Sequence, residues 1–499
     1  MSVYEDEGVT RLGWDMWKRF LIGAIIVMLL SATAVASALL LQVHETIAVF
    51  QNESTPIPGI KSVLDEVDPG GPQTILVLGS DRRYGDEKGT PVRSDTMIVV
   101  RLDPEKNATA VMSIPRDLKV RIPGHGTGKI NTAYALGGPR LSVRTVKELL
   151  GIPISHVVNV NFNGFQRAVN RLGCVFVDID RRYFNDRGGP GGYATIDLKP
   201  GYQKLCGSDS LDYVRYRHTD DDFVRAARQQ DFLRQAKGQI GLGKLFGDRK
   251  ELLKIFGQYT QTDIARDNDA AILRLIRLAY DSTKRPIQEV KFRAAQSTAN
   301  PDYVEISEEN LLKTVDEFVG VGYGSPAEKA ADEQAERKKP KAIKAPRRLA
   351  PGLVQRREAG ENHVLTLDTK LSSMDVYFPK AIYAGGGYQK ESPRLYDIYD
   401  RNKNKYRAYR LVLSMGPEHN GQYYGVQGMT WKAPPILDNP TDEVRMRNRT
   451  YKRYFDGRRI RLIAWETSKA VYWVSNSLSH TLTNRQMMDI ARSLQRIGQ

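Results

Sequence analysis

The stretch QTILVLGS, residues 73–80, is a continuous apolar run that ends in Gly-Ser. Such a run is typical of a buried strand of the parallel type, in which both faces are covered. TMIVVRL (96–102) and ATAVMSI (108–114) read as the next two strands, joined by a turn at Asp103-Pro104. We therefore expect a sheet to begin at residue 73.

Helical and strand patterns alternate after these three strands. PRLSVRTVKELLG (139–151) and FQRAVNRLG (165–173) show helical spacing, while HVVNVNF (156–162) and CVFVDI (174–179) read as strands. This alternation predicts an α/β sandwich. Further helical patterns cover 223–240, 247–258, 268–281 and 308–319.

An uncharged apolar run lies before the sheet. FLIGAIIVMLLSATAVASALLL covers residues 20–41, and a helix of this length spans a bilayer core of roughly 30 Å. Arg11, Lys18 and Arg19 precede the run, which places residues 1–19 in the cytoplasm and the rest of the chain outside it. The alternative is a cleaved signal peptide. The length of the run favours an uncleaved, single-pass anchor in the cell membrane, residues 20–43.

The net charge of +16 favours an anionic partner such as phospholipid, a phosphate-bearing polymer or nucleic acid. Export across the membrane argues against nucleic acid, so none is expected. The exported part holds both cysteines, Cys174 and Cys206, and their spacing fits no CxxC metal pattern. We expect a disulfide between them, with two buried free thiols as the alternative.

Composition divides the exported chain into a spacer, a first globular domain, a charged linker and a second domain, which we place at residues 44–72, 73–324, 325–361 and 362–499. The linker has no apolar periodicity, which indicates flexible chain. The second domain contains RIRLIAWE (459–466), AVYWVSN (470–476) and a closing helical pattern. It is predicted to be a small α+β domain.

Arginines and aspartates are concentrated in VRYRHTDDDFVRAARQQ, residues 214–230. In an extended segment, Arg215 and Arg217 would point to the same side because side chains alternate. Guanidinium groups bind phosphate oxygens in pairs, so the cluster suits a phosphate ligand. A surface ion-pair network with the three aspartates is an equal alternative.

A helix is expected to start near Phe223, with Asp221 or Asp222 as its cap. Arg225 and Gln229 would share one face of this helix, with Arg228 beside them, and the free N–H groups at its start attract phosphate. One further arginine lies beyond the first turns. It is Arg234, and its replacement by Lys is expected to be almost neutral.

Two aspartates lie at neighbouring strand ends. Asp81 follows the first strand in GSDRR (79–83), and Asp95 precedes the second in RSDT (93–96). Ligands of α/β sheets bind at such ends, and two carboxylates there suit a hard cation such as Mg²⁺. Turn-forming aspartates are the alternative.

The third strand leads into SIPRD, residues 113–117, where the chain is expected to turn. Arg116 projects at this turn, and Lys129 and Asn131 can reach the same edge. The intervening Gly-rich stretch matches no phosphate-loop pattern, so by itself it predicts only a loop.

Five motifs together resemble one family. GSDRR, RSDTM, SIPRD, GKINTAYALGG and VRYRHTDDDFVRAARQQ have the order and spacing found in the LytR–CpsA–Psr family of bacterial cell-wall glycopolymer ligases, over roughly residues 73–240. The resemblance implies an α/β/α sandwich whose apolar interior houses a prenyl tail. It also implies a phosphotransferase that moves a glycan phosphate from a polyprenyl-diphosphate carrier to a peptidoglycan hydroxyl. GCV (173–175) and LCG (205–207) resemble the disulfide-bearing actinobacterial members.

The resemblance also implies roles for individual residues. Asp81 and Asp95 would hold Mg²⁺, with Mn²⁺ as an alternative. Asp222 would orient the arginines. The groups that would grip the diphosphate are Arg93, Arg116, Arg215, Arg217, Arg225 and Gln229. Additional substrate-binding residues are Arg82, Arg83, Lys129, Asn131 and Arg228.

Two other functions fit the same residues: a pyrophosphatase acting on polyprenyl diphosphates, and an anchored phosphoglycan-binding or regulatory module without enzymatic activity. The aspartate pair favours an enzyme because binding alone requires no metal. In the second domain, RMRNRTYKRYFDGRRIRL (445–462) interleaves basic and aromatic residues. It reads either as a solvated hairpin with a basic face or as a surface for an anionic wall polymer or lipid headgroups.

Overall fold

The computed structural model describes residues 47–80, 94–106, 108–186, 195–216, 222–239, 248–264, 267–283, 285, 287–321, 341–342, 348–368, 371, 373–419, 421–446 and 449–498. Among the helices in these ranges, none combines the length and apolar character needed to span a bilayer. The predicted anchor, residues 20–43, lies outside the described residues.

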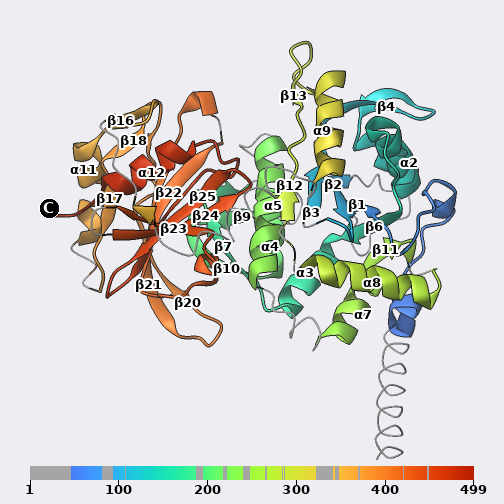
Figure 1. Ribbon diagram of the computed structural model, residues 1–499, viewed down its shortest axis with the longest axis horizontal. Coiled ribbons are helices and arrows are strands. Elements are labelled where there is room, and N and C mark those ends of the chain that lie inside the picture. The colour runs from blue at the N-terminus through green and yellow to red at the C-terminus, as the bar shows by residue number, and fades with distance from the viewer. Residues whose placement is uncertain are drawn as a thin grey trace, which may run out of the picture.

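A six-stranded mixed sheet forms the centre of the first domain (Figure 1), with the order β11-β6-β1-β2-β3-β12. Its strands are β1 (Gln73–Ser80), β2 (Ser94–Leu102), β3 (Thr109–Ser113), β6 (His156–Asn161), β11 (Thr260–Thr262) and β12 (Ile287–Glu289). β1 pairs in parallel with β6 but antiparallel with β2. The predicted parallel pairing of this strand is therefore found with β6 but not with β2. The short connection at Asp103-Pro104 likewise leaves no room for a crossover, so β3 returns antiparallel to β2.

Helices cover both faces of this central sheet. On one face, Leu76, Val99 and Met112 join a core with α2 (Thr132–Leu150) and α9 (Glu308–Gly320). On the other, Ile75 and Val158 pack against α7 (Arg249–Tyr259), α8 (Asp269–Thr283) and the helical residues 47–53. Side chains alternate along a strand, so the unbroken apolar run of β1 supplies both cores. The predicted mixed α/β domain is confirmed.

A second layer connects this domain to the C-terminal region. It contains α3 (Phe162–Arg171), β7 (Val175–Ile179), β10 (Gly201–Leu205), α4 (Gly207–Arg215) and α5 (Asp222–Gln239). β7 and β10 pair antiparallel, with Val175 opposite Leu205. Cys174 and Cys206 therefore lie just beyond the same end of the pair, and they form the expected disulfide, with 4.5 Å between their Cα atoms.

The C-terminal region is largely β rather than the balanced α+β domain that the sequence suggested. Its nine-stranded sheet, called the C-terminal sheet below, has the order β15-β23-β24-β25-β26-β22-β21-β19, with β20 paired to β21. These strands are β15 (Lys341–Ala342), β19 (Gly387–Tyr388), β20 (Arg394–Tyr399), β21 (Lys405–Ser414), β22 (Tyr423–Met429), β23 (Asp442–Met446), β24 (Arg449–Asp456), β25 (Arg459–Glu466) and β26 (Val471–Ser475). The helices are α11 (Arg357–Asp368) and α12 (Asn484–Ser493).

The remaining strands are short. They are β4 (Lys119–Ile122), β5 (Gly126–Lys129), β8 (Tyr183–Asn185), β9 (Ile196–Leu198), β13 (Ala295–Gln296), β14 (Val304–Glu305), β16 (Leu353–Gln355), β17 (Tyr377–Pro379), β18 (Ala381–Tyr383) and β27 (Leu494–Arg496). The predicted closing helix ends at Ser493 because the chain continues as β27, which pairs with β17. The hairpin expected within 445–462 forms between β24 and β25.

The two regions share one apolar core. Phe176 of β7 and Tyr202 of β10 are fully buried in a cluster with Met429, Leu462 and Trp473 of the C-terminal sheet. The rings of Tyr202 and Trp473 meet edge-on, 5.6 Å apart. The disulfide-closed pair β7–β10 is therefore the surface on which the C-terminal sheet packs.

Replacing both Cys174 and Cys206 by serine should lower the free energy of unfolding by about 3–4 kcal/mol, because the disulfide closes a long loop in the unfolded chain. Denaturant unfolding of the wild type and the double variant under non-reducing conditions measures the difference. Adding a reductant should destabilise only the wild type. An equal response in both proteins would contradict this role for the disulfide.

Candidate active site

Several strands end at one edge of the central sheet. Ser80, the last residue of β1, pairs with Asn161 at the end of β6 and with Ser94 at the start of β2. β3 ends there too, since the N–H of Ile114 donates to the carbonyl of Met97 at 2.9 Å. This side of the sheet is called the site edge below.

The predicted aspartates are only partly within the described chain. Asp95 belongs to β2, at the point where the β1–β2 register shifts. Its side chain, and the side chain of Asp222 at the start of α5, lie outside the described atoms. So do five other predicted site residues: Asp81, Arg82, Arg83, Arg93 and Arg217.

Gln229 connects α5 to the site edge by hydrogen bonds. Its side-chain nitrogen donates to Oγ1 of Thr96 on β2 and to the carbonyl of Val214 on α4, both at 3.1 Å. Arg225 lies one helical turn earlier and is only 4% exposed. The expected shared face of Arg225 and Gln229 therefore points into the protein at the site edge, and a solvated helix face is excluded for these two residues.

Arg215 reaches the same edge from α4. Its guanidinium lies 4.0 Å from the centre of the Phe162 ring, and Phe162 directly follows β6. The aromatic face holds the cation in place. The expected extended conformation was wrong here, because Val214 and Arg215 form the last turn of α4. Sequence reasoning missed Phe162, although its position directly after a strand was a usable signal.

Arg228 binds the protein backbone. Its side chain is fully buried and donates to the carbonyls of Tyr213 at 3.0 Å and Tyr216 at 2.8 Å. Its guanidinium also lies 4.4 Å from the ring centre of Tyr183. These carbonyls lie at the C-terminal end of α4, where a helix needs hydrogen-bond donors from outside its own turns. Arg228 therefore holds the end of α4 against α5, which fixes the position of Arg215.

A third group of charges follows β3. Arg116 is 8% exposed, and its Nε lies 3.5 Å from a carboxylate oxygen of Asp117. Nζ of Lys129 is 3.2 Å from the other oxygen of Asp117. The N–H of Asn131 donates to the carbonyl of Arg116 at 3.2 Å. Arg116, Lys129 and Asn131 are thus brought together, as the sequence suggested.

One ionisable group near the site edge was not anticipated. Burial raises the pKa of Asp212 on α4 to about 6, although Arg215 acts in the opposite direction. A carboxyl with this pKa changes charge near neutral pH, one turn away from a phosphate-binding candidate.

Another acidic cluster lies at the opposite edge, where β6 begins. Ligand atoms of His156, Asp263 and Asp267 all lie within 4.8 Å of one another, beside a cavity of about 320 Å³. His156 contacts Asp263 at 2.7 Å, and Lys61 pairs with Asp267 at 3.0 Å. The place of this cluster across the sheet separates it from the arginines of the site edge.

Comparison with known proteins identifies relatives of the first domain. Residues 40–318 match the LytR_cpsA_psr family. The chain is 32% identical over 255 residues to the polyisoprenyl-teichoic acid–peptidoglycan teichoic acid transferase TagU of Oceanobacillus iheyensis, covering 49% of this chain and 75% of that protein. It is 37% identical over 172 residues to the Bacillus subtilis transferase TagT, covering 34% and 53%. The crystal structure of B. subtilis TagV aligns with 50% of this chain and 98% of its own at 29% identity, with a TM-score of 0.41.

Arg228→Met should lower the free energy of unfolding by about 3 kcal/mol, because two buried carbonyls lose a charged donor. Denaturant unfolding measures the loss. Arg274→Met is the control, since Arg274 is exposed on α8. It should change stability by less than about 0.5 kcal/mol. Equal losses in the two variants would show that Arg228 does not hold α4.

Proposed function

The chain belongs to the LytR–CpsA–Psr family, and from that premise we propose that it transfers a glycan phosphate from a polyprenyl-diphosphate carrier to a hydroxyl group of peptidoglycan. The relatives TagU and TagT are named as transferases of polyisoprenyl-linked teichoic acid to peptidoglycan. The observation that carries the proposal is that polar side chains converge on strand ends at the site edge. Arg215 lies against Phe162, directly after β6, and Gln229 bonds to Thr96 on β2. Buried Arg225 lies one turn before Gln229 on α5, and buried Arg116 follows β3.

The reaction exchanges one P–O bond for another. The acceptor oxygen attacks the phosphorus next to the glycan, and the bond from that phosphorus to the oxygen of the prenyl phosphate breaks. Polyprenyl phosphate leaves, and the acceptor hydroxyl loses its proton. Such a transfer depends on in-line positioning and on neutralising the phosphate charge. Buried guanidinium groups supply this neutralisation because they remain charged and bind oxygens in pairs.

Each site residue has a proposed task. Arg116, Arg215 and Arg225 bind the diphosphate, and Gln229 keeps α5 against β2. Lys129 and Asn131 contact the donor from the β3 side. Arg228 acts indirectly, through α4. The sequence motifs alone add the remaining residues: Asp222 to orient the arginines, Arg93 and Arg217 on the diphosphate, and Arg82 and Arg83 on the donor.

We assign the metal to Asp81 and Asp95. The pairing of Ser80 with Ser94 makes the chain leave β1 beside the start of β2, which suits a site shared by the two carboxylates. Hard oxygen ligands favour Mg²⁺, with Mn²⁺ as the alternative. A bound cation there would neutralise phosphate charge.

The proposal also includes the location of the protein in the membrane and the polymer that it transfers. Residues 20–43 would anchor the chain with its catalytic part outside the cell membrane, within reach of a lipid-linked donor. The prenyl tail would lie between the central sheet and its covering helices. The disulfide-bearing segments around Cys174 and Cys206 resemble actinobacterial members, so arabinogalactan or a related wall glycopolymer is the polymer we propose.

Arg225→Lys should lower transfer from a labelled lipid-diphosphate donor about a hundredfold. A lysine keeps the charge but loses the paired hydrogen bonds, a cost of about 3 kcal/mol in the transition state. The assay counts label in peptidoglycan and in solution. Arg274→Lys, on the exposed face of α8, should transfer at the wild-type rate. If the wild type released label only into solution, the protein would be a pyrophosphatase rather than a transferase. If the wild type placed label in neither product, the protein would be a binding module without enzymatic activity.

Asp95→Asn should remove most of the Mg²⁺-dependent transfer while the melting temperature stays nearly unchanged, because the residue sits at a strand end. Asp302→Asn, at an exposed turn, is the matched control and should keep full activity. Transfer rates are measured across a magnesium titration and after chelation. Full wild-type transfer in excess chelator would rule out metal assistance.

A further inference from the structure

Helix α5 is covered on two opposite sides. Arg225 and Arg234 are nine residues apart, which at about 100° per residue places them about 180° apart around the helix and roughly 13 Å apart along it. Arg225 belongs to the site edge. Arg234 faces the C-terminal sheet, and Figure 1 shows α4 and α5 standing between that sheet and the central sheet.

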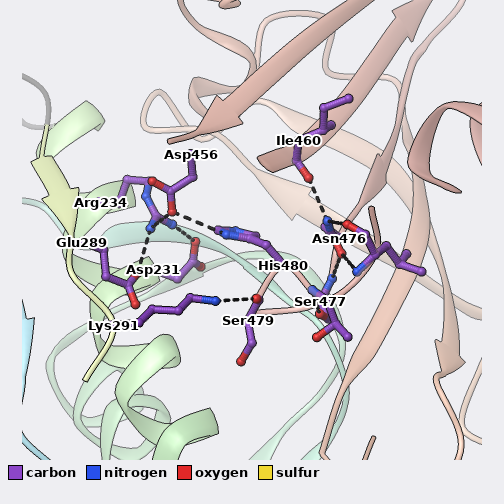
Figure 2. A network of polar contacts seen from close by, with 12 residues as sticks. Asp231, Arg234, Glu289, Lys291, Asp456, Ile460, Asn476, Ser477, Ser479 and His480 are labelled. Atoms are coloured by element: carbon purple, nitrogen blue, oxygen red, sulfur yellow. Dashed lines mark hydrogen bonds and ion pairs between the residues drawn. The ribbon is translucent and has the colours of Figure 1, made fainter. Parts of the chain in front are cut away.

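Arg234 is the centre of a partly buried ionic network (Figure 2). Its guanidinium lies 2.5 Å from Asp456 on β24, 3.0 Å from Asp231 on α5 and 3.5 Å from Glu289 on β12. This placement revises the expectation that Arg234→Lys is neutral, because one planar cation here serves three carboxylates from three elements. Lysine, a compact point charge, cannot reproduce that geometry.

The carboxyl groups of this network differ in charge at neutral pH, because burial raises the pKa of Glu289 to about 7. Although burial acts to raise it, the pKa of Asp456 is held below its ordinary value, chiefly by Arg234. His480 lies 3.5 Å from the same carboxylate, and burial lowers the pKa of His480 to about 3, so the imidazole is neutral at pH 7. Within this network, the two regions are therefore joined by the ion pair of Arg234 and Asp456. Breaking a pair that is largely shielded from solvent is costly, because it leaves a charge without its countercharge.

The network continues to the site edge through Glu289. With its amide nitrogen facing Glu289, Gln230 donates to that carboxylate and accepts from the hydroxyl of Ser113 at 3.0 Å. Ser113 ends β3, three residues before Arg116, and Gln230 adjoins Gln229. A continuous set of polar contacts thus joins Asp456 to Ser113 on β3. Gln229, the next residue to Gln230 in the chain, holds α5 on β2.

We propose that Arg234 and Asp456 are positioning residues of the transferase, through which the C-terminal sheet sets the rotation and axial position of α5 and keeps Arg225 and Gln229 in the site. This proposal rests on the proposed function. It makes the C-terminal sheet part of the catalytic unit, although the family match ends at residue 318.

The test compares two isosteric substitutions in the full-length protein. Asp456→Asn removes the charge that faces Arg234. Asp442→Asn is the matched control, because Asp442 is a buried partner of Arg453, 2.7 Å away, and both residues belong to the C-terminal sheet. Asp456→Asn should lower kcat about tenfold and change KM for the lipid donor less than twofold. Asp442→Asn should leave kcat unchanged even where it lowers the melting temperature as much.

A double-mutant cycle and a rescue variant sharpen the result. If Asp456 acts through Arg225, Asp456→Asn should reduce the rate of an Arg225→Lys enzyme far less than tenfold. Arg234→Lys keeps a positive charge beside Asp456 and should retain more kcat than Arg234→Gln. Equal kcat losses in Asp456→Asn and Asp442→Asn would show that Asp456 only stabilises the fold, and would overturn the proposal.

A measurement without donor separates this inference from the proposed function. Hydrogen–deuterium exchange of peptides from α5 should be faster in Asp456→Asn than in Asp442→Asn at matched fractions of folded protein. If the wild type transfers no glycan, the proposed function fails, and faster exchange in α5 would still establish the coupling. Unchanged exchange in α5 together with unchanged kcat would refute it.

Discussion

The burial of a polar helix is the constraint on which the structure depends. Six polar side chains of α5 are each less than 10% exposed: Arg225, Arg228, Gln229, Gln230, Asp231 and Gln235. A buried polar group without a partner costs free energy, so each of these side chains requires a hydrogen bond or a countercharge. Arg228, Gln229 and Gln230 find partners on α4, β2, β3 and β12. Arg234 of the same helix adds a partner on β24. The positions of these partners therefore determine where α5 can lie. The arrangement of the site edge and the contact between the two regions both follow from the need to pair the polar side chains of this helix.

Buried polar groups are also paired on β7, the strand next to the disulfide. Asp178 of β7 accepts from Nε1 of Trp473 at 2.9 Å and pairs with the fully buried Arg410 at 3.1 Å. Arg410 also donates to the hydroxyl of Ser475 at 2.9 Å. Around this polar centre, Phe176 and Tyr202 complete an apolar core with the C-terminal sheet. The apolar surface supplies most of the association energy, whereas the buried ion pair fixes a single orientation, because a shifted register would leave charges unpaired.

Local patterns in the sequence were enough to locate individual elements. The apolar run of β1 and the stretch that forms β25 coincide with the observed strands, and the helical spacing after Asp222 locates α5 within one residue. Local patterns failed where distant partners decide the structure. The alternation in VRYRH suggested an extended segment, yet Arg215 ends a helix whose final carbonyls are held by Arg228. The strands β20–β23 escaped notice because many of their polar side chains are paired across the C-terminal sheet, as Asp442 is with Arg453.

Three arginines of α5 show why composition alone could not assign the site. Arg225 faces the site edge, Arg228 satisfies backbone carbonyls, and Arg234 joins a carboxylate 222 residues away in sequence. Residue type alone is compatible with one shared role for all three. Only the direction of each side chain and its partner separate a phosphate ligand from a structural cation. An 18-residue helix is about 27 Å long and stiff along its axis. Contacts at Arg234 and at Gln229 are therefore not independent, since a rotation that improves one set must disturb the other.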